Sequence, residues 1–309
     1  MPQPAQPSLT ATRQLLRLLQ RLILLLCLCY FGVLLLFAGL QRKLIYAPDP
    51  RSVQPQQPDL DPQRVEQLTL NVGKNVRLLG WWSRVTPGRD SQHVVLLFPG
   101  NGGNRGNRAP LLKLWNSLGY DAILFDYRGY GGSTGSPSES AMAHDALAIW
   151  SELTTNRGLT PERIIVSGQS LGGGVATRLV WDLKQKRVTP RGLILTATFS
   201  SLTDAGAYHY PWLPVSLVLI DRYPSAQRIG AINCPLLMLH GQRDRVVPYA
   251  LGQKLFNHAP ATAENGLPKQ FISLPNADHN DILQTQAAEV AAAYRQFLLA
   301  IDQRTDGDR

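Results

Sequence analysis

"VSGQSLGGG", residues 166 to 174, follows the β-branched pair Ile164-Ile165 and precedes a stretch with helical character. Glycines stand two positions on either side of Ser170, where a side chain would collide with neighbouring backbone in a tight turn. The next glycines, Gly173 and Gly174, let a helix pack close to a sheet. The pattern therefore predicts a strand, a sharp turn that carries Ser170, and a helix. A glycine-rich turn with an idle serine would look the same locally, so the surrounding sequence must decide.

Short apolar strands alternate with amphipathic helical stretches on both sides of this turn. Strands are predicted at residues 76–85, 93–98, 121–127, 163–168, 192–197, 235–240 and 270–274. Helices are predicted at residues 111–119, 139–153, after Ser170, at 249–258 and at 282–301. Alternation of this length predicts an α/β fold over residues 65–302, with one mostly parallel sheet covered by helices on both faces.

The net charge of +9 is concentrated near the N-terminus, because residues 1–43 hold five basic residues and no acid. Elsewhere the basic residues are interspersed with acids and form no tract, which argues against a nucleic-acid partner. The three cysteines, Cys27, Cys29 and Cys234, show neither a disulfide framework nor a zinc-site spacing. We interpret them as structural thiols.

Residues 22–40, "LILLLCLCYFGVLLLFAGL", contain no charge and are long enough as a helix to cross the hydrocarbon core of a bilayer. Upstream, Arg13, Arg17 and Arg21 recur every fourth residue and share one helical face that can lie along lipid headgroups. A cleaved signal peptide is the alternative interpretation, but the apolar run is longer than usual and lacks a small-residue cleavage site. The sequence therefore favours a single-pass membrane anchor with the following domain outside the cytoplasm.

The rest of the chain divides by composition. Residues 1–44 form the basic segment and anchor, and the Pro- and Gln-rich residues 45–64 are predicted to be a semi-extended linker. The α/β domain follows at 65–302, with a cap at about 199–233, and residues 303–309 form a polar tail.

Ser170 can act as a nucleophile only if a base accepts its proton and a carboxylate orients that base. Asp244 follows the strand "PLLMLH", and His279 follows the strand "QFISL". Both fall in loops after strands, in the order that would complete a Ser-His-Asp triad. The neighbouring Asp278 and Asp281 are expected to cap the last helix, and His240 is expected to be a packing residue.

A tetrahedral intermediate at Ser170 also requires backbone N–H groups directed at its oxyanion. Leu171, at the start of the predicted helix, supplies one. The loop "PGNGGN", residues 99–104, is expected to supply the other through Asn101. Arg105 stands where a dinucleotide-binding G-x-G-x-x-G loop would have its third glycine, so this loop is not interpreted as a phosphate site.

With these pieces in place, the chain resembles the serine α/β-hydrolase superfamily across roughly residues 65–302. More narrowly, it is similar to the membrane-anchored α/β-hydrolase-domain group related to serine aminopeptidase-like hydrolases. The resemblance rests on a combination of six segments, "QRKLIYAP", "PGNGGN", "DYRGYGGSTG", "GQSLGGG", "GQRDRVVP" and "DHND". It implies a catalytic triad of Ser170, Asp244 and His279 and an oxyanion hole of Leu171 and Asn101. One departure is Pro99, which stands where the family usually has a histidine.

The predicted reaction is hydrolysis through an acyl-enzyme, which needs no cofactor or metal. The cap contains the apolar run "YPWLPVSLVLI", residues 210–220, with Trp212, Leu213 and Leu217 as candidate substrate-binding residues. We expect this run either to line an acyl-chain pocket or to touch the bilayer, and a helix packed over the sheet edge is the plainer alternative. The prediction is thus a membrane-anchored hydrolase of an apolar ester or thioester, with a small-molecule or lipid acyl substrate. A peptidase or amidase of the same fold and a non-catalytic scaffold remain as alternatives.

Overall fold

The structure is a computed structural model that describes residues 9–56, 60–88 and 91–307. Its core is an eight-stranded sheet with the order β10-β9-β8-β7-β4-β6-β3-β2. The strands are β2 (Val65–Val72), β3 (Val76–Ser83), β4 (Val94–Phe98), β6 (Asp121–Phe125), β7 (Ile164–Gln169), β8 (Gly192–Thr196), β9 (Leu236–Gly241) and β10 (Gln270–Leu274). From β10 to β6 neighbouring strands are parallel, whereas β3 pairs antiparallel with both β6 and β2. The sheet has one strand, β2, beyond those that the sequence predicts.

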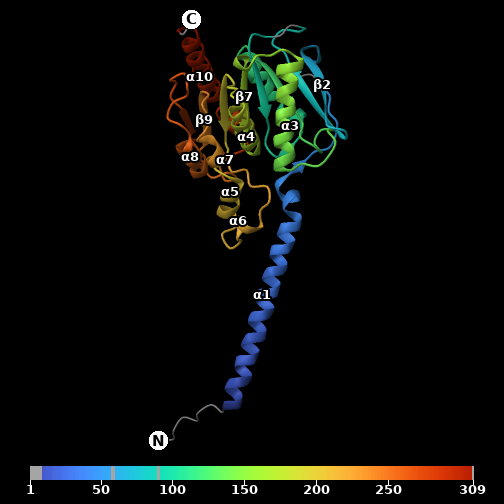
Figure 1. Ribbon diagram of the computed structural model, residues 1–309, viewed down its shortest axis with the longest axis vertical. Coiled ribbons are helices and arrows are strands. Elements are labelled where there is room, and N and C mark those ends of the chain that lie inside the picture. Colours follow the sequence, from blue (N-terminus) through green and yellow to red (C-terminus); the bar gives the residue numbers. More distant parts are fainter. Residues whose placement is uncertain (1–8, 57–59, 89–90, 308–309) are drawn as a thin grey trace.

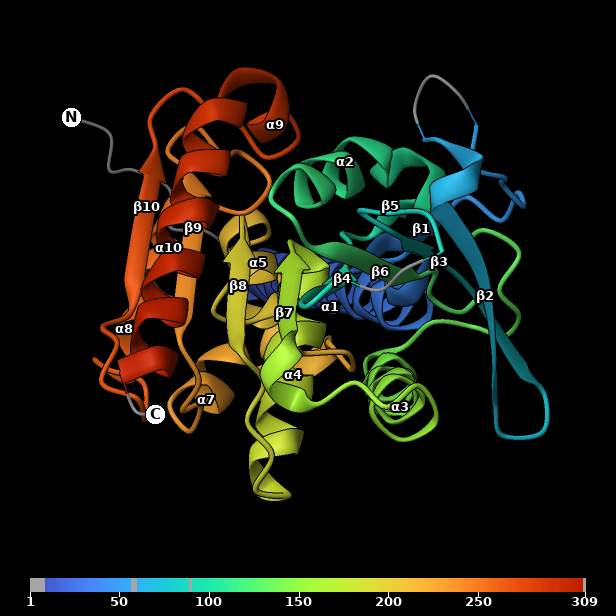
Figure 2. The ribbon, with the colours of Figure 1, turned by 90° about the horizontal axis from the view of Figure 1, so that it is seen from above.

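Helices cover both faces of this sheet (Figure 2). They are α2 (Ala109–Ser117), α3 (Glu139–Ser151), α4 (Leu171–Gln185), α8 (Tyr249–His258), α9 (Ile282–Thr285) and α10 (Ala287–Gly307). Alternate residues of a strand point to opposite faces, so on β4 Leu96 packs with α3 and α4 while Val95 packs with α2 and α10. The predicted α/β sheet with two covered faces is confirmed.

The first helix, α1 (Leu9–Ile45), extends away from the domain as a single rod (Figure 1). Within the described residues, its segment Arg13–Ile45 is the one helix long and apolar enough to cross a membrane. The first eight residues of the predicted basic segment lie outside the described residues.

Three short helices form the cap between β8 and β9, namely α5 (Leu202–His209), α6 (Val215–Val218) and α7 (Ser225–Ile229). Figure 1 shows α5 and α6 below the sheet, on the side from which α1 leaves the domain. The cap and the last turns of α1 are joined by side-chain contacts, among them a hydrogen bond from Arg42 Nε to Asp221 at 3.0 Å, and Tyr46, just after α1, donates its hydroxyl to the same carboxylate.

The stretch predicted to be a linker differs from a free spacer. Tyr46 and Leu60 are buried, and β1 (Ala47–Pro48) pairs in parallel with β5 (Gly102–Gly103). Two of its apolar side chains are therefore packed in the hydrophobic core, which its polar composition does not predict. Residues 57–59 of this stretch lie outside the described part. At the other end, α10 continues to Gly307, through most of the stretch predicted to be a polar tail.

Candidate active site

Ser170 occupies a strained turn between β7 and α4. Its φ of 53° and ψ of −121° lie in a region that residues other than glycine rarely adopt. The Ser170 N–H donates to the Thr196 carbonyl at 2.9 Å, and the Thr198 hydroxyl donates to the Ser170 carbonyl at 2.8 Å. A Cβ at Gly168 or Gly172 would overlap neighbouring backbone atoms. The turn therefore needs the glycines that the sequence places there.

Three side chains that are far apart in sequence form one hydrogen-bonded row. His279 Nε2 lies 2.9 Å from Ser170 Oγ, and His279 Nδ1 lies 2.7 Å from Asp244 Oδ2. The ionised Asp244 carboxylate can only accept a hydrogen bond, so His279 Nδ1 must carry the proton. In the neutral imidazole the lone pair of Nε2 then faces the serine hydroxyl. All three side chains are buried. This geometry suits a general base that takes a proton from Ser170.

Asp244 is held by four donors. Its Oδ1 accepts the N–H groups of Val246 and Val247 at 2.9 and 2.7 Å, while Oδ2 is shared by His279 and His240. Burial alone would raise the pKa of Asp244, but the hydrogen bonds from His240, His279 and Val247 outweigh it and lower the pKa to about 2. The stability that these bonds contribute is present above the ordinary pKa of about 4 and is lost as pH falls toward 2. Asp244 is therefore ionised at neutral pH.

His240 is a site residue that the sequence analysis predicts only as packing. It is fully buried, and its Nε2 lies 2.9 Å from the Val247 carbonyl and 3.2 Å from Asp244 Oδ2. Both neighbours are acceptors, so Nε2 carries the proton and donates to both. His240 thus positions Asp244 without touching the reacting atoms. In the sequence His240 is the last residue of the strand "PLLMLH", and nothing around it predicts the contact with Asp244.

Replacing His240 with leucine, which has similar volume but no donor, is expected to lower kcat by about tenfold with KM nearly unchanged, because Asp244 loses one orienting bond. His240→Gln can present an N–H and should recover most of the loss. Steady-state kinetics of the two variants, compared with thermal unfolding, check this. If kcat fell equally in His240→Leu and His240→Gln, and in proportion to the fraction of folded protein, His240 would have a packing role instead.

The loop of residues 99–104 passes directly against Ser170. A Cβ added at Gly100 would lie 3.4 Å from the Ser170 Cβ. The loop is held from outside by hydrogen bonds from Ala47 N–H and the Tyr130 hydroxyl to the Asn101 carbonyl, at 3.1 and 2.7 Å. The Asn101 side chain donates to the Ile45 carbonyl at 2.7 Å. The segment after α1 thus positions the loop that the sequence predicts as half of the oxyanion hole.

Leu171, the other predicted donor, is the first residue of α4. N–H groups in the first turn of a helix have no partner within the helix and are available to an anion. Pro99, the departure from the family pattern, offers its carbonyl to the Tyr127 hydroxyl at 2.8 Å. The loop is therefore tied down without a histidine at that position.

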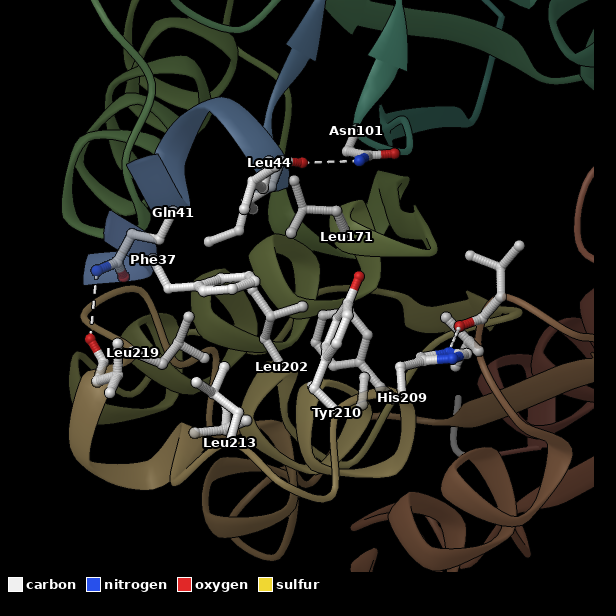
Figure 3. Close-up of a pocket in the computed structure, with 18 of the residues that line it drawn as sticks. Phe37, Gln41, Leu44, Asn101, Leu171, Leu202, His209, Tyr210, Leu213 and Leu219 are labelled. Atoms are coloured by element: carbon white, nitrogen blue, oxygen red, sulfur yellow. Dashed lines mark hydrogen bonds between the residues drawn. The ribbon is translucent and has the colours of Figure 1, made fainter. Parts of the chain in front are cut away.

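Two cavities of opposite character meet at Ser170. The first, of about 260 Å³, is lined mainly by apolar side chains of the cap and of α1 (Figure 3). The second, of about 400 Å³, is lined by polar and backbone groups, including Asn107, Arg108, Gln169 and Asn280. Asn101, Ser170 and Val246 belong to both. A bound molecule that spans both cavities would pass over the serine hydroxyl.

Arg108 is the cation of the polar cavity. Its guanidinium donates to the Gly102 carbonyl, its Nε is buried without a hydrogen-bond partner, and burial lowers its pKa. The nearby Asp126 is engaged by Arg105 at 2.5 Å. Among the described residues Arg108 has no carboxylate within ion-pair distance, so its charge is available to a ligand.

The three cap residues predicted to bind substrate separate in the structure. Leu213 is buried and lines the apolar cavity. Trp212 and Leu217 do not line it and are exposed, because the chain turns over residues 211–213 and α6 directs Val215 and Val218 inward instead. For these two residues the substrate-pocket assignment is wrong in this structure. The pocket-lining residues of α1, including Phe37 and Leu44, are absent from the sequence prediction.

Similarity to known proteins agrees with this architecture. The family model for serine aminopeptidase, S33, matches residues 89–222. An uncharacterized protein of Mycobacterium tuberculosis is 37% identical over 267 residues, covering 86% of this chain and 90% of that protein. The lysophosphatidylserine lipase ABHD12 of Macaca fascicularis is 33% identical over 246 residues, covering 71% of this chain and 60% of the lipase. The chain is an α/β-hydrolase. It is related to the ABHD group, as the six sequence segments predict.

Solved structures show the same fold at low sequence identity. An esterase of Pyrococcus furiosus superposes with a TM-score of 0.63 at 21% identity, covering 83% of this chain and 98% of the esterase. The mouse alpha/beta hydrolase domain-containing protein 10 superposes with a TM-score of 0.54 at 19% identity, covering 79% of this chain and all of that one. The predicted fold class is thus confirmed.

One smaller feature of the α/β-hydrolase site, the role of two aspartates beside His279, differs from expectation. Asp278 and Asp281 do not cap a helix through their side chains; Asp281 accepts the Asp278 N–H and Asp278 accepts the His279 N–H, both at 2.7 Å. They shape the loop that carries His279. Across the described residues, no group of three or more His, Cys, Asp or Glu side chains could hold a metal ion.

Proposed function

We propose that this α/β-hydrolase is a membrane-anchored serine esterase that releases a fatty acid from single-chain lipid esters. The observation that carries the proposal is the position of Ser170 at the junction of an apolar and a polar cavity. A molecule with one acyl chain and one polar headgroup fits that pair of cavities, with its ester carbonyl at the serine.

In the proposed reaction Ser170 attacks the ester carbonyl while His279 Nε2 takes the hydroxyl proton. Asp244 stabilises the resulting imidazolium, and the N–H groups of Leu171 and Asn101 stabilise the oxyanion. His279 then gives the proton to the departing alcohol, which leaves an acyl-enzyme on Ser170. Water, deprotonated by His279, attacks the acyl carbonyl and releases the fatty acid with regeneration of the serine.

Arg108 supports an anionic headgroup on the leaving-group side. A guanidinium with no carboxylate partner among the described residues binds a phosphate or carboxylate through charge-assisted hydrogen bonds. The relative named as a lysophosphatidylserine lipase acts on a lipid of this chemical class, which supports the proposal for the present chain. We therefore propose anionic lysophospholipids as the preferred substrates.

The hydropathy of α1 supports a single-pass anchor with residues 22–40 in the bilayer, and the hydrolase domain outside the cytoplasm remains the predicted orientation. Two alternatives are kept for the test, and one of them has specific support. The matching family model carries the name of a serine aminopeptidase, which favours amide cleavage. A scaffold without activity would keep the fold and leave Ser170 unreactive.

Fatty-acid release by the full-length protein in nanodiscs tests the proposal with three substrates that share one acyl chain. We expect an anionic lysophospholipid to be cleaved about tenfold faster than the neutral monoacylglycerol, and the N-acyl amide at under about 1% of either rate. Arg108→Gln should reduce the ratio of the two cleavage rates, anionic lysophospholipid over monoacylglycerol, toward one. Arg178→Gln, which removes a surface guanidinium paired with Asp182, is the matched control. Faster amide cleavage would identify an amidase, and no cleavage with no reaction at Ser170 would indicate a scaffold.

A further inference from the structure

The last turns of α1 form one wall of the apolar cavity. Phe37, Gln41 and Leu44 stand at positions i, i+4 and i+7, which place them on one face of the helix. All three line the cavity. Figure 3 shows them opposite Leu202, Leu213 and Leu219 of the cap. A helix whose composition identifies it as a membrane span is therefore part of the pocket next to Ser170.

Polar contacts hold this face of α1 against the cap. Gln41 is buried, its Nε2 donates to the Val218 carbonyl at 3.2 Å, and its Oε1 accepts the Ile220 N–H at 2.7 Å. Below it, the Tyr30 hydroxyl donates to the Trp212 carbonyl at 2.8 Å. An amide side chain at the end of an apolar span is costly in lipid unless it finds such partners. Gln41 thus fixes α1 to the cap and closes the cavity on that side.

The cap also reaches down beside the part of α1 that has no charge. Tyr30 precedes Leu40, the end of the charge-free run, by ten residues. At helical rise this is about 15 Å, half the thickness of the hydrocarbon core. Trp212, whose carbonyl Tyr30 contacts, is 53% exposed, and Leu217 is 82% exposed. Exposed apolar side chains at that depth are suited to lipid contact rather than to water.

The rim of the cavity faces the same way. Leu44 is 63% exposed and Tyr210 is 46% exposed, although both line the cavity. Both therefore contact the cavity and the surroundings of α1 at once. The mainly apolar cavity thus extends from Ser170 to a rim that is open on the side of α1.

We propose that α1 is a substrate-binding element as well as an anchor, and that the acyl chain of the substrate lies against Phe37 and Leu44. The membrane helix then sets acyl-chain preference directly. This inference rests on the proposed function, since it places the acyl group of that substrate.

Two fluorophosphonates with the same reactive group, one with a dodecyl chain and one with an ethyl group, test the inference in the full-length protein in nanodiscs. The ratio of their labelling rates at Ser170 measures chain binding, and the ethyl probe corrects for any change in the nucleophile. We expect the wild-type ratio to favour the dodecyl probe by about tenfold or more, in line with several methylenes bound in an apolar pocket.

Leu44→Trp narrows the rim, and Phe37→Ala removes part of the wall; each should reduce the ratio by about fivefold or more. Leu35→Trp is the control for a tryptophan on α1 outside the cavity, because Leu35 is exposed, lies two residues from Phe37 and is on the opposite face of the helix. An unchanged ratio in both pocket variants overturns the inference and leaves the esterase proposal intact. Absence of labelling by either probe in well-folded wild type overturns the proposed function itself, and with it the inference.

Discussion

Full-length protein with Ser170→Ala is expected to lose all labelling by a fluorophosphonate and to hydrolyse lipid esters at least about 10³-fold more slowly than wild type. The Ser170 hydroxyl is the group that becomes acylated, and among the described residues no other hydroxyl is hydrogen-bonded to His279 Nε2. Alanine has nearly the same backbone preferences as serine, so the strained turn at φ 53° should be no harder to form. The loss is therefore expected in well-folded protein.

The comparison with Ser167→Ala makes this prediction specific. Ser167 lies on the same strand, β7, is also buried, and has no contact with His279. Its replacement should leave labelling within about twofold of wild type, while both variants keep their thermal unfolding temperature. Labelling that survives in Ser170→Ala would show that another residue reacts, and the proposed triad would be wrong.

The order of the three candidate site residues explains how the sequence alone brings them together. Ser170 directly follows β7, and Asp244 and His279 lie in the loops after β9 and β10, three strands that run in parallel. The carboxyl ends of parallel strands meet at one edge of a sheet, so loops that follow those strands converge whatever their separation in sequence. Periodicity and turn residues are enough to find strands of this kind. The convergence of these three loops can therefore be predicted without knowledge of side-chain packing.

The parts that the sequence does not predict depend on contacts without a local pattern. β1 and β5 pair over two residues each, too short for a period to be visible. The docking of α1 depends on a few single bonds to the cap, such as those of Gln41 and Tyr30, and the sequence of an apolar run does not show which of its residues will make them. His240 likewise occupies an ordinary interior position of β9. For the same reason the sequence does not show that Leu213 faces the pocket while Trp212 is exposed, because this depends on the turn over residues 211–213.

Replacing Gly172 with alanine is expected to lower the thermal unfolding temperature by roughly 5–10 °C, corresponding to about 3 kcal/mol. Helix propensity predicts the opposite sign, because alanine stabilises a helix by about 1 kcal/mol relative to glycine. However, a Cβ at this position in α4 would overlap the carbonyl oxygens of Phe98 and Pro99. Neither is a flexible side chain that can turn away, since Phe98 belongs to the central strand β4.

Relief of that overlap requires α4 to move away from the sheet or the loop after β4 to move away from Ser170. The second movement would displace Asn101, so the variant should also lose esterase activity beyond its loss of folded protein. Gly102→Ala is the control for stability, because a Cβ there meets no atom within 4 Å, and its unfolding temperature should stay within about 2 °C of wild type. Differential scanning fluorimetry of both variants measures the contrast. A Gly172→Ala protein as stable as wild type would mean that α4 does not approach β4 as closely as the structure shows, and the close approach that positions the oxyanion loop would have to be reconsidered.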